Sequence, residues 1–204
     1  LAAGYGKRMM PLTKETPKPL LKIGSETLLD RNIKHVLSNG FDEIIINVSH
    51  HGDKIKEHLI KNYKDHKLTL VEEPHPYGTG GALVNAKDYL GDETILIINA
   101  DIFHDFDLSK LNKETECIHL VGIKNPDHNS DGDFNIGSDG KVFCDDINKL
   151  TWSGISLLNT DILSKINNNN FPFDSWSSIV LPQIKEEKVT GEIYSDIWLD
   201  VGTK

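Results

Sequence analysis

The sequence predicts an α/β fold: a Rossmann-like mixed, mostly parallel sheet flanked by helices, with a smaller β-rich lid. Three observations predict it. Short apolar runs of strand length alternate with helical periodicity through residues 28–99. A loop containing two glycines follows the opening residues LAAG, which we interpret as the end of a first strand. Beyond Cys117 the pattern changes to short strands separated by tight turns.

The first helix is predicted by four apolar residues on one helical face: Leu29, Ile33, Val36 and Leu37. Gly40 follows them and supplies a C-terminal stop, because glycine tolerates the left-handed conformation that ends many helices. A strand that opens on LAAG is short, so we expect further residues ahead of Leu1.

The elements that follow alternate in the same way: a strand at 43–48 (EIIINV), a helix with Ile55, Leu59 and Ile60 on its buried face, a strand at 68–71, a helix at 79–89 and a strand at 94–99 (TILIIN). Such alternation indicates right-handed βαβ units and a sheet covered on both faces.

The region after Cys117 predicts a β-hairpin, formed by residues 134–136, a turn at 138–140 and residues 141–143. We therefore expect one unit over residues 1–204, divided into a core at 1–116 and a second part at 117–204.

Charge and composition exclude several classes of protein. The net charge of -9 argues against binding of a nucleic-acid polymer, because phosphate backbones favour basic surfaces. The first 22 positions nevertheless carry five basic residues and one acid: Lys7, Arg8, Lys14, Lys18, Lys22 and Glu15. A short basic segment on an acidic protein suits a small anion.

Nothing in the sequence predicts a membrane span or a signal peptide. Cys117 and Cys144 lack metal-ligand spacing, and two cysteines cannot form a disulfide framework. We expect a cytoplasmic protein with buried or inert thiols.

The loop at 3–13 (AGYGKRMMPLT) is suited to phosphate. Gly4 and Gly6 let the backbone approach a ligand, Arg8 can donate two hydrogen bonds to a phosphate, and Lys18 adds a mobile charge. The alternative is a tight turn with surface lysines. The loop is not a dinucleotide fingerprint, which needs glycine where Met9 stands, and it lacks the Walker A sequence.

Residues 1–24 (LAAGYGKRMMPLTKETPKPLLKIG) resemble the signature of the sugar-1-phosphate nucleotidyltransferase family. The resemblance continues at 78–83 (GTGGAL), 99–101 (NAD) and 198–203 (WLDVGT). It implies the nucleotide-diphospho-sugar transferase fold, a sugar-binding lid, and an enzyme that joins a nucleotide to a sugar 1-phosphate and releases pyrophosphate. Mg²⁺ is the implied cofactor, and the substrates are a nucleoside triphosphate and a sugar 1-phosphate.

The resemblance also implies which residues hold the nucleotide: Leu1, Ala2, Ala3, Gly4, Gly6, Lys7, Glu73, Gly78, Thr79 and Gly80. The glycine-rich segment would hold the base, with Glu73 beside it and uracil or thymine as the base. The alternative is a helix start capped by Thr79. Arg8 is expected to hold the β- and γ-phosphates and Lys18 to neutralise the reacting phosphates.

Asp101 follows an apolar strand, at the edge where ligands bind in open α/β sheets, and a carboxylate there suits a hard cation. The alternative is a turn aspartate, since His104 and Asp105 follow in what we expect to be a polar loop. Asp200 resembles the second magnesium-binding aspartate of the family, with a strand-end turn made by Gly202 as the alternative.

For the sugar, Asn125 and Asp133 can hydrogen-bond hydroxyl or acetamido groups, and Gly154 can admit the ring close to backbone. Asn99 joins them by the resemblance. The alternative is a polar loop rich in turns. Residues 125–134 and 151–158 resemble the uridylyltransferases acting on N-acetylmuramate 1-phosphate in cell-wall recycling. The tryptophans at 152 and 176 are expected to pack within the protein.

Other activities stay open. The enzyme could act on glucose, mannose or N-acetylglucosamine 1-phosphate, or on choline phosphate. A non-catalytic regulator that binds sugar nucleotides is a second class, and a nicotinamide dehydrogenase a third. The oligomeric state is not predicted.

Overall fold

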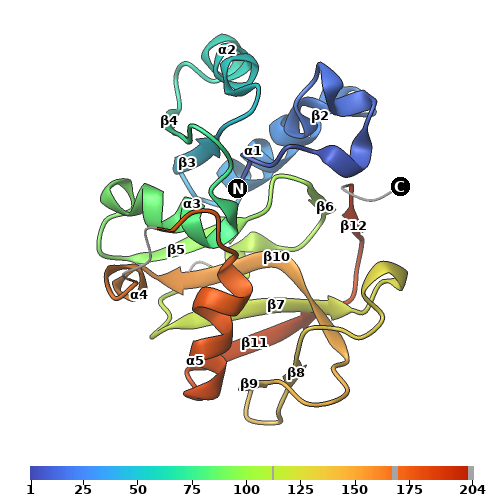
Figure 1. Ribbon diagram of the computed structural model, residues 1–204, viewed down its shortest axis with the longest axis vertical. Coiled ribbons are helices and arrows are strands. Elements are labelled where there is room, and N and C mark those ends of the chain that lie inside the picture. Colours follow the sequence, from blue (N-terminus) through green and yellow to red (C-terminus); the bar gives the residue numbers. More distant parts are fainter. Residues whose placement is uncertain (112, 167–169, 202–204) are drawn as a thin grey trace.

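The structure, a computed structural model, describes residues 1–111, 113–166 and 170–201. Its centre is a sheet region with helices packed on it (Figure 1). The strands there are β3 (Glu43–Val48), β4 (Lys67–Glu72), β5 (Thr94–Ile98), β7 (Ile118–Lys124), β10 (Leu150–Asn159) and β11 (Val189–Tyr194).

Two groups of strands form this region. In one, β3 and β4 run parallel, and in the other the order is β11-β7-β10-β5. The opening segment lies between the groups: the Leu1 amine donates to the Ile98 carbonyl at 2.7 Å, and the Ala2 amide donates to Asn47 Oδ1 at 2.8 Å. β10 runs antiparallel to both β5 and β7, whereas β11 runs parallel to β7. The α/β architecture predicted from the sequence is confirmed, with an antiparallel strand inside a mixed sheet.

The helices are α1 (Leu28–Ser38), α2 (Gly52–Asn62), α3 (Gly78–Ala86), α4 (Asp161–Ser164) and α5 (Leu181–Lys185), the last continuing a π-helical segment at Trp176–Val180. Short 3-10 segments lie at Lys7–Met9, Leu12–Lys14, Lys18–Leu20, Lys87–Tyr89, Leu108–Leu111 and Asp127–Asn129. α1 begins with a reciprocal cap, in which the Asp30 amide donates to the Thr27 hydroxyl and the Thr27 amide donates to the Asp30 carboxylate.

The three long helices and the strands expected at 43–48, 68–71 and 94–99 are confirmed within a few residues. The expected first strand ending at residues 1–4 is not, because this segment has a backbone hydrogen bond to β5 but forms no strand. Two details are corrected. Ile60 was assigned to the buried face of the second helix but is 62% exposed, because only Ile55 and Leu59 face the sheet. Thr79 is not a cap, since α3 begins at Gly78 and the Thr79 hydroxyl instead accepts a hydrogen bond from the Ser175 amide at 2.8 Å.

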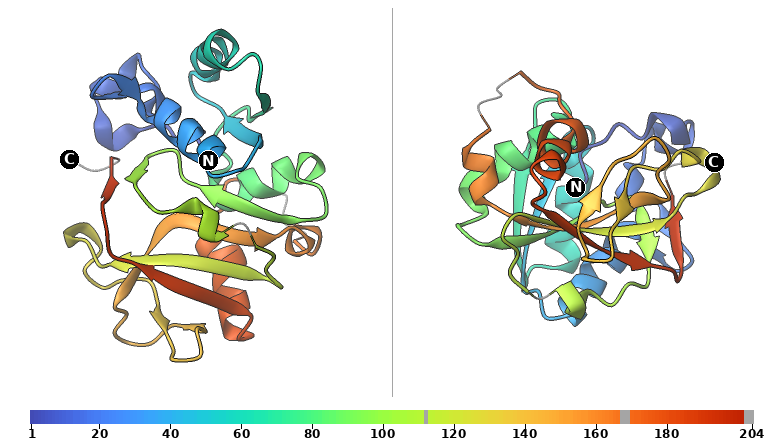
Figure 2. Two further views of the ribbon diagram at one scale, coloured as in Figure 1. Left: turned by 180° about the vertical axis from the view of Figure 1, so that it is seen from behind. Right: turned by 90° about the horizontal axis from the view of Figure 1, so that it is seen from below.

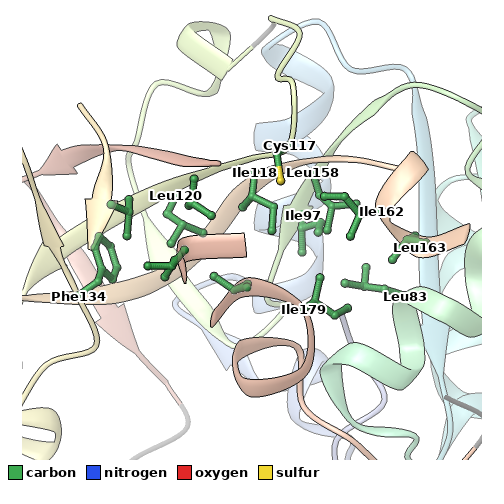
Figure 3. Close-up of a cluster of buried hydrophobic side chains, with 14 of the residues drawn as sticks. Leu83, Ile97, Cys117, Ile118, Leu120, Phe134, Leu158, Ile162, Leu163 and Ile179 are labelled. Atoms are coloured by element: carbon green, nitrogen blue, oxygen red, sulfur yellow. The ribbon is translucent and has the colours of Figure 1, made fainter. Parts of the chain in front are cut away.

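Apolar side chains fill three clusters. The largest joins α3, β5, β7 and β10 to the π-helical segment and α5, and its members include Leu83, Ile97, Leu120, Phe134 and Ile179 (Figure 3). Because these elements come from both halves of the sequence, burial of this cluster ties the second half of the chain to the first.

The hairpin expected after Cys117 is confirmed as β8 (Asn135–Ile136) and β9 (Val142–Phe143), which pair antiparallel and lie beside β11 and α5 (Figure 1). A smaller hairpin, β1 (Lys22–Ile23) and β2 (Glu26–Thr27), follows the basic N-terminal segment. The division at residue 116 stays a prediction.

Both thiols are free: Cys117 is buried and Cys144 is exposed. Within the described part of the chain, no helix has the length and apolar character to cross a bilayer.

Candidate active site

Asp101 and Asp200 converge through two short strands. β6 (Ile102–His104) begins directly after Asp101, and β12 (Trp198–Asp200) pairs with it antiparallel, so that Asp200 faces Ile102. The Val201 amide donates to the Asp101 carbonyl at 2.9 Å. Both views in Figure 2 show β12 running beside β6. The spacing of the two aspartates in the sequence does not predict this convergence. Gly202 and Thr203 of the C-terminal motif lie outside the described residues.

Lys18 reaches the same place from the N-terminal segment. Its ammonium Nζ lies 2.5 Å from Asp101 Oδ2, and the lysine is only 9% exposed. Lys18 is the first residue of the 3-10 segment that follows Pro17, and the flanking prolines restrict the backbone around it. A buried ammonium and a carboxylate therefore meet at the carboxyl end of β5.

The N-terminal loop is shaped by Gly6. Its φ is +62°, and a Cβ at this position would lie 2.9 Å from Thr13 Cγ2. The Thr13 hydroxyl donates to the Gly6 carbonyl at 2.8 Å and closes the loop. Lys7 and Arg8 follow on the exposed surface of the loop. The tight turn is thus present, with both cations accessible to a ligand.

His128 is a neighbour of Asp200 that sequence analysis missed. Its Nε2 lies 3.7 Å from Asp200 Oδ2, and it belongs to the 3-10 segment Asp127–Asn129 that follows β7. This segment therefore contacts Asp200, one of the two paired aspartates. Local sequence does not predict this contact, because it depends on where β12 ends.

His104 corrects another expectation. The residues after Asp101 were expected to form a polar loop, but His104 lies in β6 with no exposed surface, and neither ring nitrogen has a hydrogen-bond partner in the described structure. Burial, together with the nearby charges of His35 and Arg31, lowers the pKa of His104 to about 4. The ring is a neutral part of the core behind the aspartates.

Glu73 was expected beside the base, and it is buried with a 4% exposed fraction. Its Oε1 accepts a hydrogen bond from Asn47 Nδ2 at 2.8 Å, and its Oε2 accepts one from the Tyr77 amide at 2.8 Å. Asn47, at the end of β3, is a further residue that the sequence analysis did not single out. The two side chains link β3 to the segment before α3.

The glycine-rich start of α3 packs against a loop from the second half of the chain. A Cβ at Gly80 would lie 2.6 Å from the Phe173 ring, and one at Gly78 would lie 2.3 Å from the Phe173 carbonyl oxygen. The amides of Gly80 and Gly81 donate to that carbonyl at 3.1 and 3.3 Å. These glycines therefore permit a close approach of the backbone at Phe173. That Gly78, Thr79 and Gly80 bind the base stays a prediction.

Asn99 and Gly154, two of the predicted sugar-binding residues, are in contact. The Asn99 amide donates to the Gly154 carbonyl at 2.9 Å, and a Cβ on Gly154 would lie 2.7 Å from Asn99 Nδ2. Gly154 has a φ of +82° and lies where the β7–β10 register shifts. The glycine thus admits the Asn99 side chain beside Asp101.

Asn125 and Asp133 use their polar atoms within the segment between β7 and β10, which contains the β8–β9 hairpin and is called the lid below. Asn125 Nδ2 donates to the Asn148 carbonyl at 2.9 Å, and its Oδ1 accepts from the Thr151 hydroxyl at 3.1 Å. Asp133 Oδ2 accepts from the Trp152 amide at 2.8 Å. These bonds favour a role in holding the loop, and the predicted sugar contacts of both residues remain untested.

The donor set fits Mg²⁺ that is shared with a phosphate ligand. Within residues 1–111, 113–166 and 170–201, no group of three or more acidic, histidine or cysteine side chains could hold a metal. Mg²⁺ is commonly bound by one or two carboxylates together with substrate phosphates and water, and Asp101 and Asp200 supply two carboxylates from adjacent strand ends.

A cavity of about 710 Å³ lies elsewhere, between β3 and β5. It is lined mainly by apolar side chains of these strands, α1 and α3, and by neither Lys18 nor the two aspartates. The charged groups place the candidate active site at the strand ends instead.

Comparisons with known proteins agree on one family. The sequence model described as nucleotidyl transferase matches residues 1–122. The chain is 30% identical to N-acetylmuramate alpha-1-phosphate uridylyltransferase of Neisseria meningitidis, over 100% of the chain and 91% of that protein. It is 29% identical to D-glycero-alpha-D-manno-heptose 1-phosphate guanylyltransferase of Campylobacter jejuni, over 99% of the chain and 92% of the relative.

Solved structures share the fold. HddC from Yersinia pseudotuberculosis superposes with a TM-score of 0.82 at 24% identity, covering 99% of this chain and 92% of the other. A UDP-glucose pyrophosphorylase complexed with UDP-glucose gives a TM-score of 0.76 at 19% identity, over 99% and 91% of the two chains. The expected fold class is confirmed.

Proposed function

Because the chain belongs to the sugar-1-phosphate nucleotidyltransferase family and is an enzyme of that kind, we propose that it transfers UMP from UTP to N-acetylmuramate 1-phosphate and releases pyrophosphate. The convergence of Lys18, Asp101 and Asp200 carries this proposal. A buried cation and two carboxylates at one edge of the sheet suit a reaction between two phosphate anions.

The reaction is a displacement at phosphorus. An oxygen of the sugar phosphate, already anionic, bonds to the α-phosphorus of UTP. The bond from that phosphorus to the oxygen bridging to the β-phosphate breaks, and pyrophosphate leaves with the electron pair. No general base is needed, so positioning and charge neutralisation supply the catalysis. Bound between Asp101 and Asp200, Mg²⁺ would supply positive charge that offsets the repulsion between the reactants.

Other groups of the protein bind the phosphates and neutralise their charge. Lys18 leaves Asp101 to neutralise charge on the α-phosphate or the sugar phosphate, a short movement for a flexible side chain. Arg8, exposed on the N-terminal loop, binds the β- and γ-phosphates of the leaving group. The amides after Gly4 and Gly6 complete the phosphate site, and the base lies near the start of α3.

The choice of UTP and the muramate rests on sequence likeness. The uridylyltransferase of Neisseria meningitidis matches the whole chain, and its name states both the sugar and the base. Other relatives act on heptose or mannose 1-phosphate with guanine nucleotides, so the sugar and the base are the parts of the proposal to test first. A muramate substrate would place the enzyme in cell-wall recycling.

The test measures pyrophosphate release with Mg²⁺, each of the four nucleoside triphosphates, and a panel of sugar 1-phosphates. The panel contains N-acetylmuramate, N-acetylglucosamine, glucose, mannose and the manno-heptose. We expect the highest kcat/KM with UTP and the muramate. Preference for another pair would keep the reaction and overturn the substrate assignment.

A further inference from the structure

We propose that Glu73 is a positioning residue that, through Asn47, fixes the start of the phosphate loop relative to the segment that begins α3. This inference rests on the proposed function in taking both segments to bind the nucleotide. It replaces the expectation that Glu73 contacts the base.

The network is a continuous chain of hydrogen bonds across three segments. The Ala2 amide donates to Asn47 Oδ1 at 2.8 Å, and Asn47 Nδ2 donates to Glu73 Oε1 at 2.8 Å. Glu73 Oε2 then accepts from the Tyr77 amide at 2.8 Å. The Glu73 amide donates to the Val48 carbonyl at 2.8 Å, which fixes its backbone beside β3.

The two ends of this hydrogen-bond network determine which atom donates and which accepts at every step. Both ends are backbone N–H groups, of Ala2 and Tyr77, and a backbone amide can only donate. Asn47 must accept from one end and therefore donates from its other atom. The side chain at position 73 must then accept twice, and a carboxylate does this whereas an amide does not.

Burial separates this role from direct recognition of the base. Glu73 is 4% exposed and Asn47 is 6% exposed. Each Glu73 oxygen is already bonded to a protein donor, and because the side chain is buried a base edge would have to displace part of the network to reach it. Since an opened network leaves buried donors unsatisfied, contact through Glu73 would cost stability at the moment of binding.

The link joins the two halves of the nucleotide site. Ala2 precedes Gly4 and Gly6 by a few residues, and Tyr77 precedes Gly78. The Tyr77 ring also stacks on Phe171 at 4.1 Å between centroids, and the Phe173 amide donates to the Tyr77 carbonyl at 3.0 Å. A displacement of the Glu73 side chain would therefore move the glycine-rich start of α3 relative to the loop at 3–13.

The test exchanges the two side chains. Glu73→Gln leaves one N–H facing another, and Asn47→Asp places two acceptors against each other. The double variant Asn47→Asp with Glu73→Gln restores every pair: the Ala2 amide donates to Asp, the Gln amide donates to Asp, and the Gln carbonyl accepts from Tyr77. Each single variant should raise the KM for UTP about tenfold, by the loss of a buried hydrogen bond, and the double variant should return it to within about threefold of the parent.

Steady-state kinetics are the first readout, and they distinguish positioning from mere support of the fold. The assay temperature is kept well below the Tm of every variant, so the active fraction is constant. Positioning predicts a higher KM for UTP with the KM for the sugar phosphate unchanged. A lower kcat with both KM values unchanged would overturn it, as would a double variant no better than the singles. Asn135→Asp is the matched control. Asn135 is a buried asparagine in the lid, and its side-chain amide donates to the Ile147 carbonyl. Loss of that hydrogen bond should leave the KM for UTP unchanged.

A second readout keeps the inference separate from the proposed function. Hydrogen exchange at the Ala2 and Tyr77 amides should accelerate in each single variant and recover in the double variant, whatever the substrate. A changed preference among the four nucleotides in Glu73→Gln, without recovery in the double variant, would show that Glu73 contacts the base and would overturn the proposal.

Discussion

The ion pair of Lys18 and Asp101 sets the first expectation at the scale of single residues. Lys18→Ala and Asp101→Ala should each lower kcat/KM on the order of 10²–10³, because each removes charge complementarity that matters most in the transition state. Steady-state pyrophosphate release measures the effect. Each variant must first be shown to fold by circular dichroism, because each leaves a partly buried charge without its partner.

The control for these variants is Lys14→Ala. Lys14 carries the same charge in the same basic segment but is exposed. The kcat/KM of the Lys14→Ala variant should therefore stay within about twofold of the parent value. If Lys18→Ala and Asp101→Ala retained normal turnover, the assignment of both residues to the reaction would be wrong.

His104 predicts a pH dependence of stability. The pKa of its imidazole falls from 6.5 in the unfolded chain to about 4 in the folded protein, mainly because of burial. Between these values the unfolded chain binds more protons at this residue, so the free energy of unfolding decreases as the pH falls from about 6.5 toward about 4. The shift corresponds to a loss on the order of 3 kcal/mol, fully present at the lower limit.

Urea denaturation at several pH values tests this expectation with His104→Phe. An apolar ring of similar size removes the titration and leaves no unpaired nitrogen, so the slope with pH should flatten. His66→Gln removes an exposed histidine and should leave the slope unchanged. Equal slopes in the parent and His104→Phe would contradict the assignment.

At the scale of elements, Gly154 illustrates a strand that depends on one residue. It interrupts the β7–β10 register with a φ of +82°, and an added Cβ would lie 2.7 Å from Asn99 Nδ2. Gly154→Ala should therefore carry two costs, about 1–2 kcal/mol for the left-handed backbone and a further cost for displacing the Asn99 side chain. Because Asn99 precedes Asp101 by two residues, kcat/KM should also fall.

Gly140→Ala separates the two costs. Gly140 has a φ of +79° in the lid hairpin, yet a Cβ there would meet nothing within 4 Å. Its substitution should show only the backbone cost in urea denaturation, and activity should be unchanged. If Gly140→Ala destabilised the protein as much as Gly154→Ala, contact with Asn99 would not be the cause.

The elements also show what local sequence can predict. Helix faces such as Leu29 and Ile33, and the lid hairpin, follow from periodicity and turn residues that lie within one segment. The partners of Asn47 and Glu73 do not, because they depend on which strands become neighbours. Motif resemblance found Lys18 and the two aspartates. Asn47 lies in none of the motifs, and His128 lies in the segment 125–134 but was not singled out there.

At the scale of the whole molecule, the order of the strands decides the site. β10 lies between β5 and β7 and antiparallel to both, although it follows them in sequence. Nothing within residues 150–159 specifies that placement, since it arises from long-range pairing and from the shared core of both halves. The same arrangement returns the chain to β6 through β12 and brings Asp200 to Asp101.

The final prediction concerns how metal and nucleotide act on the stability of the whole chain. Asp101 is already neutralised by Lys18, so the metal is not needed to hold the fold, and chelation with EDTA alone should leave the Tm unchanged. UTP with Mg²⁺ at about 100 times its Kd should stabilise the folded state by about 2.7 kcal/mol, which raises the Tm of a chain of this size by about 5–10 °C.

Thermal denaturation with UTP, with Mg²⁺, with both and with EDTA added measures each contribution. Asp200→Asn should lose most of the part that requires Mg²⁺ and keep the part due to UTP alone. A large decrease in Tm on adding EDTA without nucleotide would instead mean that a metal is part of the resting fold, because only an ion bound before the nucleotide could then be removed.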